Sequence, residues 1–131
     1  MTFPEPYLEF IELFNEERFW HSHEALELAW RENGSTFYKG LIIFASAFVH
    51  VQRGNPVGVR KQMAKALRYL GPYAPSYLGL DVTALLRHAD FCHTLAAAWE
   101  ADPTAPVPRF PLYRLALDPA HVRGDEAERA P

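Results

Sequence analysis

The segment 37–53 is apolar on nearly every side of the helix that its residue spacing predicts. A helix without a polar face is stable in water only where other elements surround it. Its longest apolar run, Leu41–Val49, is about half the length that spans a bilayer, and His50 follows it directly. We therefore expect residues 41–51 to form the central helix of a bundle.

Glycine and proline divide the rest of the chain into further segments. Breaks fall at 33–35, 54–56 and 71–79, and apolar residues recur between them at helical spacing. The weak break at 15–18 leaves open whether the residues before it and after it form two helices or one bent helix. The first segment shows the spacing well, with apolar side chains at Tyr7, Phe10, Ile11 and Phe14.

Two of the predicted helices begin with a capping signal. Asn55 precedes Pro56, and proline suits the first position of a helix because its missing N–H would have no partner there. Asp81 precedes the segment that ends near Trp99, and its carboxylate can accept a hydrogen bond from the first turn. We expect Asn55 and Asp81 to be structural caps.

Prolines are frequent beyond Asp102, and they exclude a central strand because proline cannot donate a hydrogen bond within a sheet. Strand-like alternation is scarce in the rest of the chain. The sequence therefore predicts an all-α fold, an antiparallel bundle of four to five helices over residues 1–102. We expect residues 103–131 to form an irregular, proline-rich tail that is packed on the bundle or trails from it.

Length and charge exclude several classes of protein. The chain has 131 residues, enough for one domain with its own core. A net charge of −3 argues against a dedicated nucleic-acid binder, which normally needs a strongly basic face. The start of the chain lacks the pattern of a secretory signal, and one cysteine gives no reason to expect an oxidising compartment. We expect a soluble, cytoplasmic protein that binds neither nucleic acid nor membranes.

One group of polar residues could carry chemistry. His23 and Glu27 are four residues apart, so they share one face of a helix, and Glu24 is offset from that face by one position. Lys39 and His50 lie on a polar stripe of the central helix. If these two helices meet along their polar stripes, the five side chains form a cluster inside the bundle. We predict a contact network of His23, Glu27 and His50 with Glu24 beside it.

This cluster allows three interpretations, which the sequence leaves open. A hydrogen-bonded network would fix which helix faces meet, and the protein would then be a binding or interaction module. His23, Glu27 and His50 could instead hold a divalent metal or a small ligand. A hydrolase would use Glu24 or Glu27 as its general base. We favour the interaction module and predict no cofactor, and the sequence identifies neither a substrate nor a partner.

A second pair, His88 and Cys92, also has helical spacing, and a thiolate with an imidazole can bind zinc. No CxxC or HExxH pattern completes a zinc motif around them. We therefore prefer to interpret Cys92 as a buried, small apolar residue.

Charge and aromatic content point to a second copy of the chain. The first two helical segments are rich in glutamate, whereas residues 56–70 are rich in arginine and lysine. These charges could stay in water, or an acidic face could meet a basic one within the bundle or between copies. Aromatic residues make up 14% of the chain, so rings such as Tyr73 and Tyr77, or the proline-rich tail, could cover a neighbouring subunit. We predict a homodimer.

Several motifs occur in an order that a known family shares. The most specific are the string His-Glu-x-x-Glu-x-x-Trp from His23 and the turn Arg-Gly-Asn from Arg53. Over about residues 8–100 the chain resembles the bacterial family called domain of unknown function 309. The resemblance implies a compact all-α domain and no assigned activity. That family often has glutamine where this chain has Lys39 and Ile43. Its characteristic polar positions fall on His23, Glu24, Glu27, His50 and Asn55.

Overall fold

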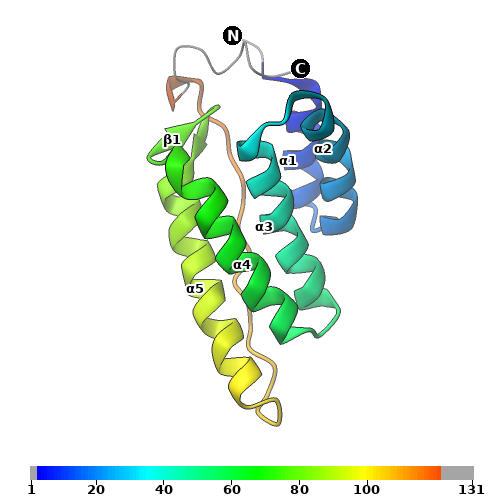
Figure 1. Ribbon diagram of the computed structural model, residues 1–131, viewed down its shortest axis with the longest axis vertical. Coiled ribbons are helices and arrows are strands. Elements are labelled where there is room, and N and C mark those ends of the chain that lie inside the picture. The colour runs from blue at the N-terminus through cyan, green and yellow to red at the C-terminus, as the bar shows by residue number, and fades with distance from the viewer. Residues whose placement is uncertain (1–2, 122–131) are drawn as a thin grey trace.

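The computed structural model describes residues 3–121 and confirms the all-α fold. A short hairpin precedes the last long helix, with β1 (Ser76–Tyr77) antiparallel to β2 (Leu80–Asp81). Turns of 3₁₀ helix cover Gly71–Tyr73 and Pro119–His121. The α-helices of the described part, shown in Figure 1, are α1 (Glu5–Asn15), α2 (Phe19–Asn33), α3 (Thr36–Gln52), α4 (Pro56–Leu70) and α5 (Val82–Ala101).

The segment 16–18 separates α1 from α2, so the chain forms two helices here and not one bent helix. Glu17 adopts a left-handed backbone conformation with φ of 62°, and its N–H donates to the carbonyl of Phe14. A residue in this conformation ends a right-handed helix. The turn that follows sends α2 back along α1.

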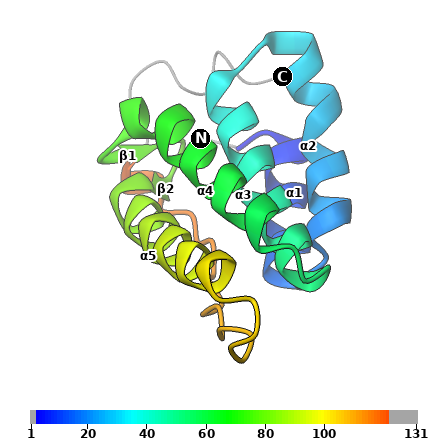
Figure 2. The ribbon, with the colours of Figure 1, turned by 60° about the horizontal axis from the view of Figure 1, so that its bottom comes forward.

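Each helix packs against the next one along the chain, and neighbours run antiparallel (Figure 1 and Figure 2). Near the start of α2, Phe19 stacks on Phe48 at the end of α3, with ring centroids 5.1 Å apart. At the other end of α2, Trp30 lies beside Lys39 at the start of α3. Helix α3 packs against both the glutamate-rich helix α2 and the basic helix α4.

Helix α3 is the most buried helix, as its apolar sequence predicts. Phe44 is fully buried, and its ring packs against Phe14 and Phe48. A close approach at Gly40 brings α4 against α3, because a Cβ there would lie 2.6 Å from Leu70 Cδ2. Glycine at this position therefore sets how closely the two helices pack.

The two capping residues lie at the starts of α4 and α5. The Asn55 side chain accepts a hydrogen bond of 3.1 Å from the N–H of Gly58. The Asp81 carboxylate accepts one of 3.0 Å from the N–H of Ala84. Each side chain thus satisfies a backbone donor that the first turn leaves without a helical partner.

Beyond α5, the chain returns along the length of the bundle, as Figure 1 shows. Asn15 holds it in place, since its side chain donates to the Leu115 carbonyl and accepts from the Leu115 N–H, both at 2.8 Å. Leu115 is buried, and Leu117 forms a bridge with Leu80. The tail is therefore held against the bundle as far as Asp118, whose N–H donates to the Gly79 carbonyl, and residues 122–131 lie outside the described part.

Tyr73 and Tyr77, which we expected to cover a neighbouring subunit, contact their own chain, and the homodimer stays a prediction. Both rings pack against Phe37 of their own chain, and Tyr77 is buried. Tyr73 lies in the 3₁₀ turn and Tyr77 in the hairpin, and both segments fold onto the end of the bundle. They create a packed region for aromatic rings that the number of helices does not predict. Within residues 3–121, no helix is both long enough and apolar enough to span a membrane.

Candidate functional site

Most of the polar residues predicted from the sequence lie along α2 and on the polar stripe of α3, the helix against which α2 packs. We call this surface the seam face. It consists of four residues of α2, which follow one helical stripe, and four of the polar stripe on α3 and its C-cap. They are Trp20, His23, Glu27 and Trp30 on α2, with Lys39, Ser46, His50 and Arg53 on α3.

The structure brings His23 and Glu27 together on α2. The imidazole Nε2 lies 4.0 Å from a Glu27 carboxylate oxygen, and both side chains are partly exposed. The other Glu27 oxygen accepts a hydrogen bond of 2.6 Å from Arg31. Nδ1 of His23 is buried and has no hydrogen-bond partner. Trp20 covers this imidazole, with ring centroids 5.3 Å apart.

His50 belongs to a different set of contacts. Its Nδ1 accepts a hydrogen bond of 3.2 Å from the side-chain amide of Asn55, and its ring packs on Gly58 of α4. Within the described residues, no hydrogen bond or ion pair joins His50 to His23 or Glu27. The polar stripe of α3 is wide enough to face two helices, and His50 lies on the side that faces α4.

Glu24 lies apart from the pair as well. It lines a shallow hollow between α1 and α2 together with Glu9, Arg18 and His21. One position along a helix turns a side chain by about 100° because 3.6 residues complete a turn. Glu24 therefore faces α1, whereas His23 and Glu27 face α3.

Two cations of the seam face lie on aromatic rings. Lys39 Nζ is 5.2 Å from the ring centre of Trp30 and 5.2 Å from that of Tyr69 on α4. The guanidinium of Arg53 lies 5.7 Å from the ring centre of Trp20. Within residues 3–121, neither cation forms an ion pair with a carboxylate. Sequence spacing placed both on one stripe, but the rings beneath them follow from how α2 packs.

A metal site at the seam face would need more ligands than the described residues supply. Structural zinc takes four protein ligands and catalytic zinc three. Within residues 3–121, no group of three or more His, Cys, Asp or Glu side chains is placed to hold a metal ion. His23 and Glu27 form only a pair, so the metal hypothesis stays a prediction.

The second pair, His88 and Cys92, lies inside the bundle. Cys92 Sγ is 3.5 Å from His88 Nε2, and burial raises the pKa of the Cys92 thiol to about 12. A thiol with this pKa is neither a nucleophile nor a ready metal ligand near neutral pH. Burial lowers the pKa of His88, although a hydrogen bond with the backbone of Pro111 opposes that shift. His88 stacks between Phe48 and Tyr113, so this pair is part of the core.

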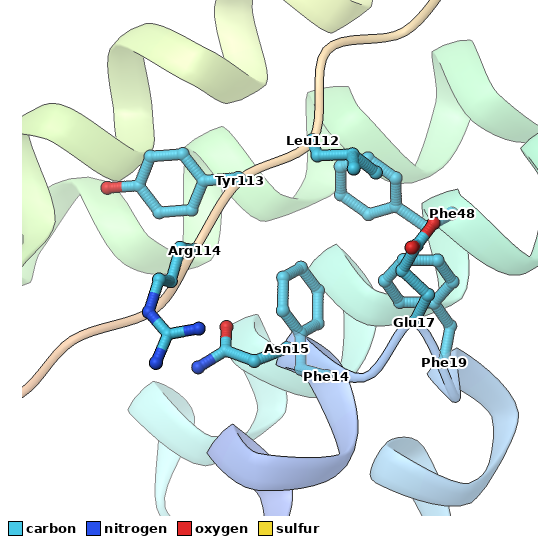
Figure 3. Close-up of a pocket in the computed structure, with 8 residues that line it drawn as sticks. All are labelled: Phe14, Asn15, Glu17, Phe19, Phe48, Leu112, Tyr113 and Arg114. Atoms are coloured by element: carbon cyan, nitrogen blue, oxygen red, sulfur yellow. The ribbon is translucent and has the colours of Figure 1, made fainter.

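A hollow of about 230 Å³ opens where α1 ends, between the turn to α2 and the tail segment 112–114. Its floor is three rings in mutual contact, those of Phe14, Phe19 and Phe48. Figure 3 shows Arg114 and Glu17 on opposite sides of it, with Leu112 at the rim. We call it the aromatic hollow. No sequence pattern predicts this hollow, because its wall includes a tail segment whose course has no helical signal.

Comparison with known proteins identifies a match to a family model and assigns no activity. A search of curated proteins found no match to the chain. The family match ends within α4, so it covers less of the chain than the resemblance to residue 100 implies. It contains both specific motifs, the string from His23 and the turn from Arg53. The resemblance is therefore confirmed: residues 7–62 of this chain match the family described as Domain of unknown function (DUF309).

Proposed function

We propose that this protein is a binding module whose seam face contacts an acidic segment of a partner protein. The observation that carries this proposal is the placement of Lys39 and Arg53 on tryptophan rings, with no carboxylate paired to either within residues 3–121. An aromatic ring holds a cation in place without neutralising it. Both cations therefore keep donors free for an anion.

The separation of the two cations favours a polypeptide over a small anion. They are fourteen positions apart on α3 and its C-cap, which corresponds to about 21 Å at 1.5 Å per residue. One phosphate or carboxylate cannot reach both. An extended chain of about seven residues spans this distance, at roughly 3.3 Å per residue.

The surroundings of Arg53 resemble the centre of a protein interface. Trp20 is 50% exposed, and tryptophan and arginine are the residues that most often dominate binding energy at interfaces. A guanidinium whose face lies on a ring still presents its edge, which can bind a carboxylate through two hydrogen bonds. A partner glutamate at this point would also cover the exposed ring.

Titration of the protein with poly-L-glutamate at low salt, followed by tryptophan fluorescence, tests the proposal. Trp20 and Trp30 lie on the seam face, so we expect binding to change tryptophan emission. We expect Arg53→Gln and Lys39→Gln each to weaken binding about tenfold, the equivalent of about 1.4 kcal/mol for a charged contact. Arg87→Gln, which removes an exposed cation from α5, is the matched control and should bind like the wild type.

A short peptide distinguishes two linked contacts from general attraction. A triglutamate is too short to reach both cations, so its affinity should respond to Arg53→Gln or to Lys39→Gln and not to both. No binding of poly-L-glutamate would contradict the proposal. So would an equal effect of Arg87→Gln and Arg53→Gln, or stronger binding of a nucleic acid than of the polypeptide.

A further inference from the structure

The aromatic hollow lies on a surface that the proposed function does not use, and its rim has an unusual composition for an exposed edge. Leu112 is 70% exposed there. Beside it, Arg114 and Glu17 carry opposite charges, and neither forms an ion pair within the described residues. An apolar floor with an exposed leucine and two unpaired charges around it is typical of an interface that lacks its partner.

The tail fixes which side chains face outward. From Leu112 to Asp118, exposure alternates along the chain, as it does in an extended strand. Tyr113 turns inward onto His88, and Leu115 is buried. Leu112 and Arg114 therefore share the outward face, and the anchored residues between and after them hold that face in place.

The opposite side of the hollow is equally well held. Glu17 lies in the tight turn between α1 and α2, and its carbonyl accepts a hydrogen bond of 3.3 Å from Gln52 of α3. In Figure 3 its carboxylate lies across the hollow from the guanidinium of Arg114. Because both charges are attached to anchored backbone, a partner could pair with them at little cost in ordering.

We propose that the occupant of the aromatic hollow is a second copy of this chain, related to the first by a two-fold axis at the mouth of the hollow. In such a dimer each surface meets its own copy, so a residue on one side of the axis contacts the residue on the other side. Arg114 of each copy then pairs with Glu17 of the other. The two Leu112 side chains cover the phenylalanine rings.

The charges favour this occupant over a small amphipathic ligand. A carboxylate bound by Arg114 would share the hollow with the negative charge of Glu17, and an amine would meet the positive charge of Arg114. The two-fold arrangement instead neutralises both charges of both copies. It also accounts for the exposed leucine on a surface that is otherwise polar at its rim.

Light scattering of the full chain across a wide range of concentrations tests the proposal. We expect the mass to rise with concentration from 14.9 kDa toward twice that value. Leu112→Asp should shift this transition to concentrations at least tenfold higher. Phe91→Asp is the matched control, because Phe91 is also a large exposed apolar residue, lies on α5 and does not line the hollow, so its replacement should leave the transition unchanged.

Charge reversal tests the pairing itself. Glu17→Arg and Arg114→Glu should each weaken the dimer, since each places like charges opposite one another. The double variant restores opposite charges and should recover the dimer. The side chains replaced in these two experiments are all exposed, and circular dichroism checks that each variant folds. They are Glu17, Phe91, Leu112 and Arg114.

Three outcomes would overturn the proposal. The first is a mass of one chain at every concentration. The second is a dimer that Leu112→Asp leaves unchanged, and the third is a double charge variant that dimerises no better than either single variant. None of these outcomes bears on the seam face, so failure here and failure of the proposed function can be told apart.

Discussion

The imidazole of His50 lies directly against the backbone of Gly58, so no side chain fits between α3 and the first turn of α4. A Cβ at Gly58 would lie 2.5 Å from Cγ and from Nδ1 of the ring. The same Nδ1 accepts the hydrogen bond from Asn55, the cap of α4. His50 therefore positions the start of α4. This structural role accounts for its contacts, and they require no catalytic or ligand-binding role.

Gly58→Ala should lower the free energy of unfolding. Overpacking of a filled site lowers the free energy of unfolding by about 1–3 kcal/mol, and the better helix propensity of alanine offsets about 1 kcal/mol of that loss. We expect a net loss of up to about 2 kcal/mol by urea denaturation. Gly71→Ala is the control, because its Cβ would meet nothing within 4 Å, and equal stability of the two variants would contradict the close approach at His50.

Phe44→Ala should remove a large part of the stability of the bundle. The ring is fully buried among aromatic neighbours, and such truncations cost about 3–5 kcal/mol. Phe91→Ala removes the same ring from an exposed site on α5, and we expect its effect to stay within about 0.5 kcal/mol. Urea denaturation of both variants measures the difference. Similar losses would show that α3 is not the centre of the fold.

His88 should make the protein less stable in mild acid. Burial lowers the pKa of His88 in the folded state, so below the ordinary value of about 6.5 the unfolded chain binds a proton that the folded chain does not. Stability then falls as the pH drops through the interval between the ordinary pKa and the lowered one. Denaturation midpoints measured from pH 7.5 to 5 should show this slope, and His88→Gln should flatten it. An unchanged slope in the variant would assign the effect to other groups.

Metal addition tests the remaining interpretation of the pair on α2. A metal bound only to the folded state raises the melting temperature by mass action. His23 and Glu27 are two candidate ligands, fewer than the three or four protein ligands of a zinc site. We therefore expect Zn²⁺ to change the melting temperatures of the wild type and of His23→Ala by the same amount. A rise in the wild type that His23→Ala abolishes would support the metal hypothesis. The contact between His23 and Glu27 is partly exposed and should contribute about 1 kcal/mol or less.

Part of the candidate site follows from sequence spacing. The i, i+4 relation of His23 and Glu27 places them together on any helix, and the structure shows that contact. The partner of His50 could not be predicted in the same way. Periodicity defines which residues share a face of α3, but that face is wide enough to meet either α2 or α4. The close approach at Gly58 decides which one His50 contacts.

The aromatic hollow shows the opposite case, a site with no local signal. Its floor comes from three helices, and one wall comes from a tail segment about a hundred residues away from Asn15, which binds it. The hydrogen bonds between Asn15 and Leu115 join these distant parts. No spacing rule connects residues so far apart in the chain.

The sequence by itself determined the all-α class, the capped starts of α4 and α5 and the central place of α3, because these depend on local hydrogen bonds and on the pattern of apolar side chains. Only the tertiary structure decided that His50 faces α4, that Tyr73 and Tyr77 pack against Phe37 of their own chain, and that the tail forms one wall of a hollow. Those outcomes depend on contacts between distant segments. Such contacts form where shapes fit at close range, and a one-dimensional pattern does not contain that fit.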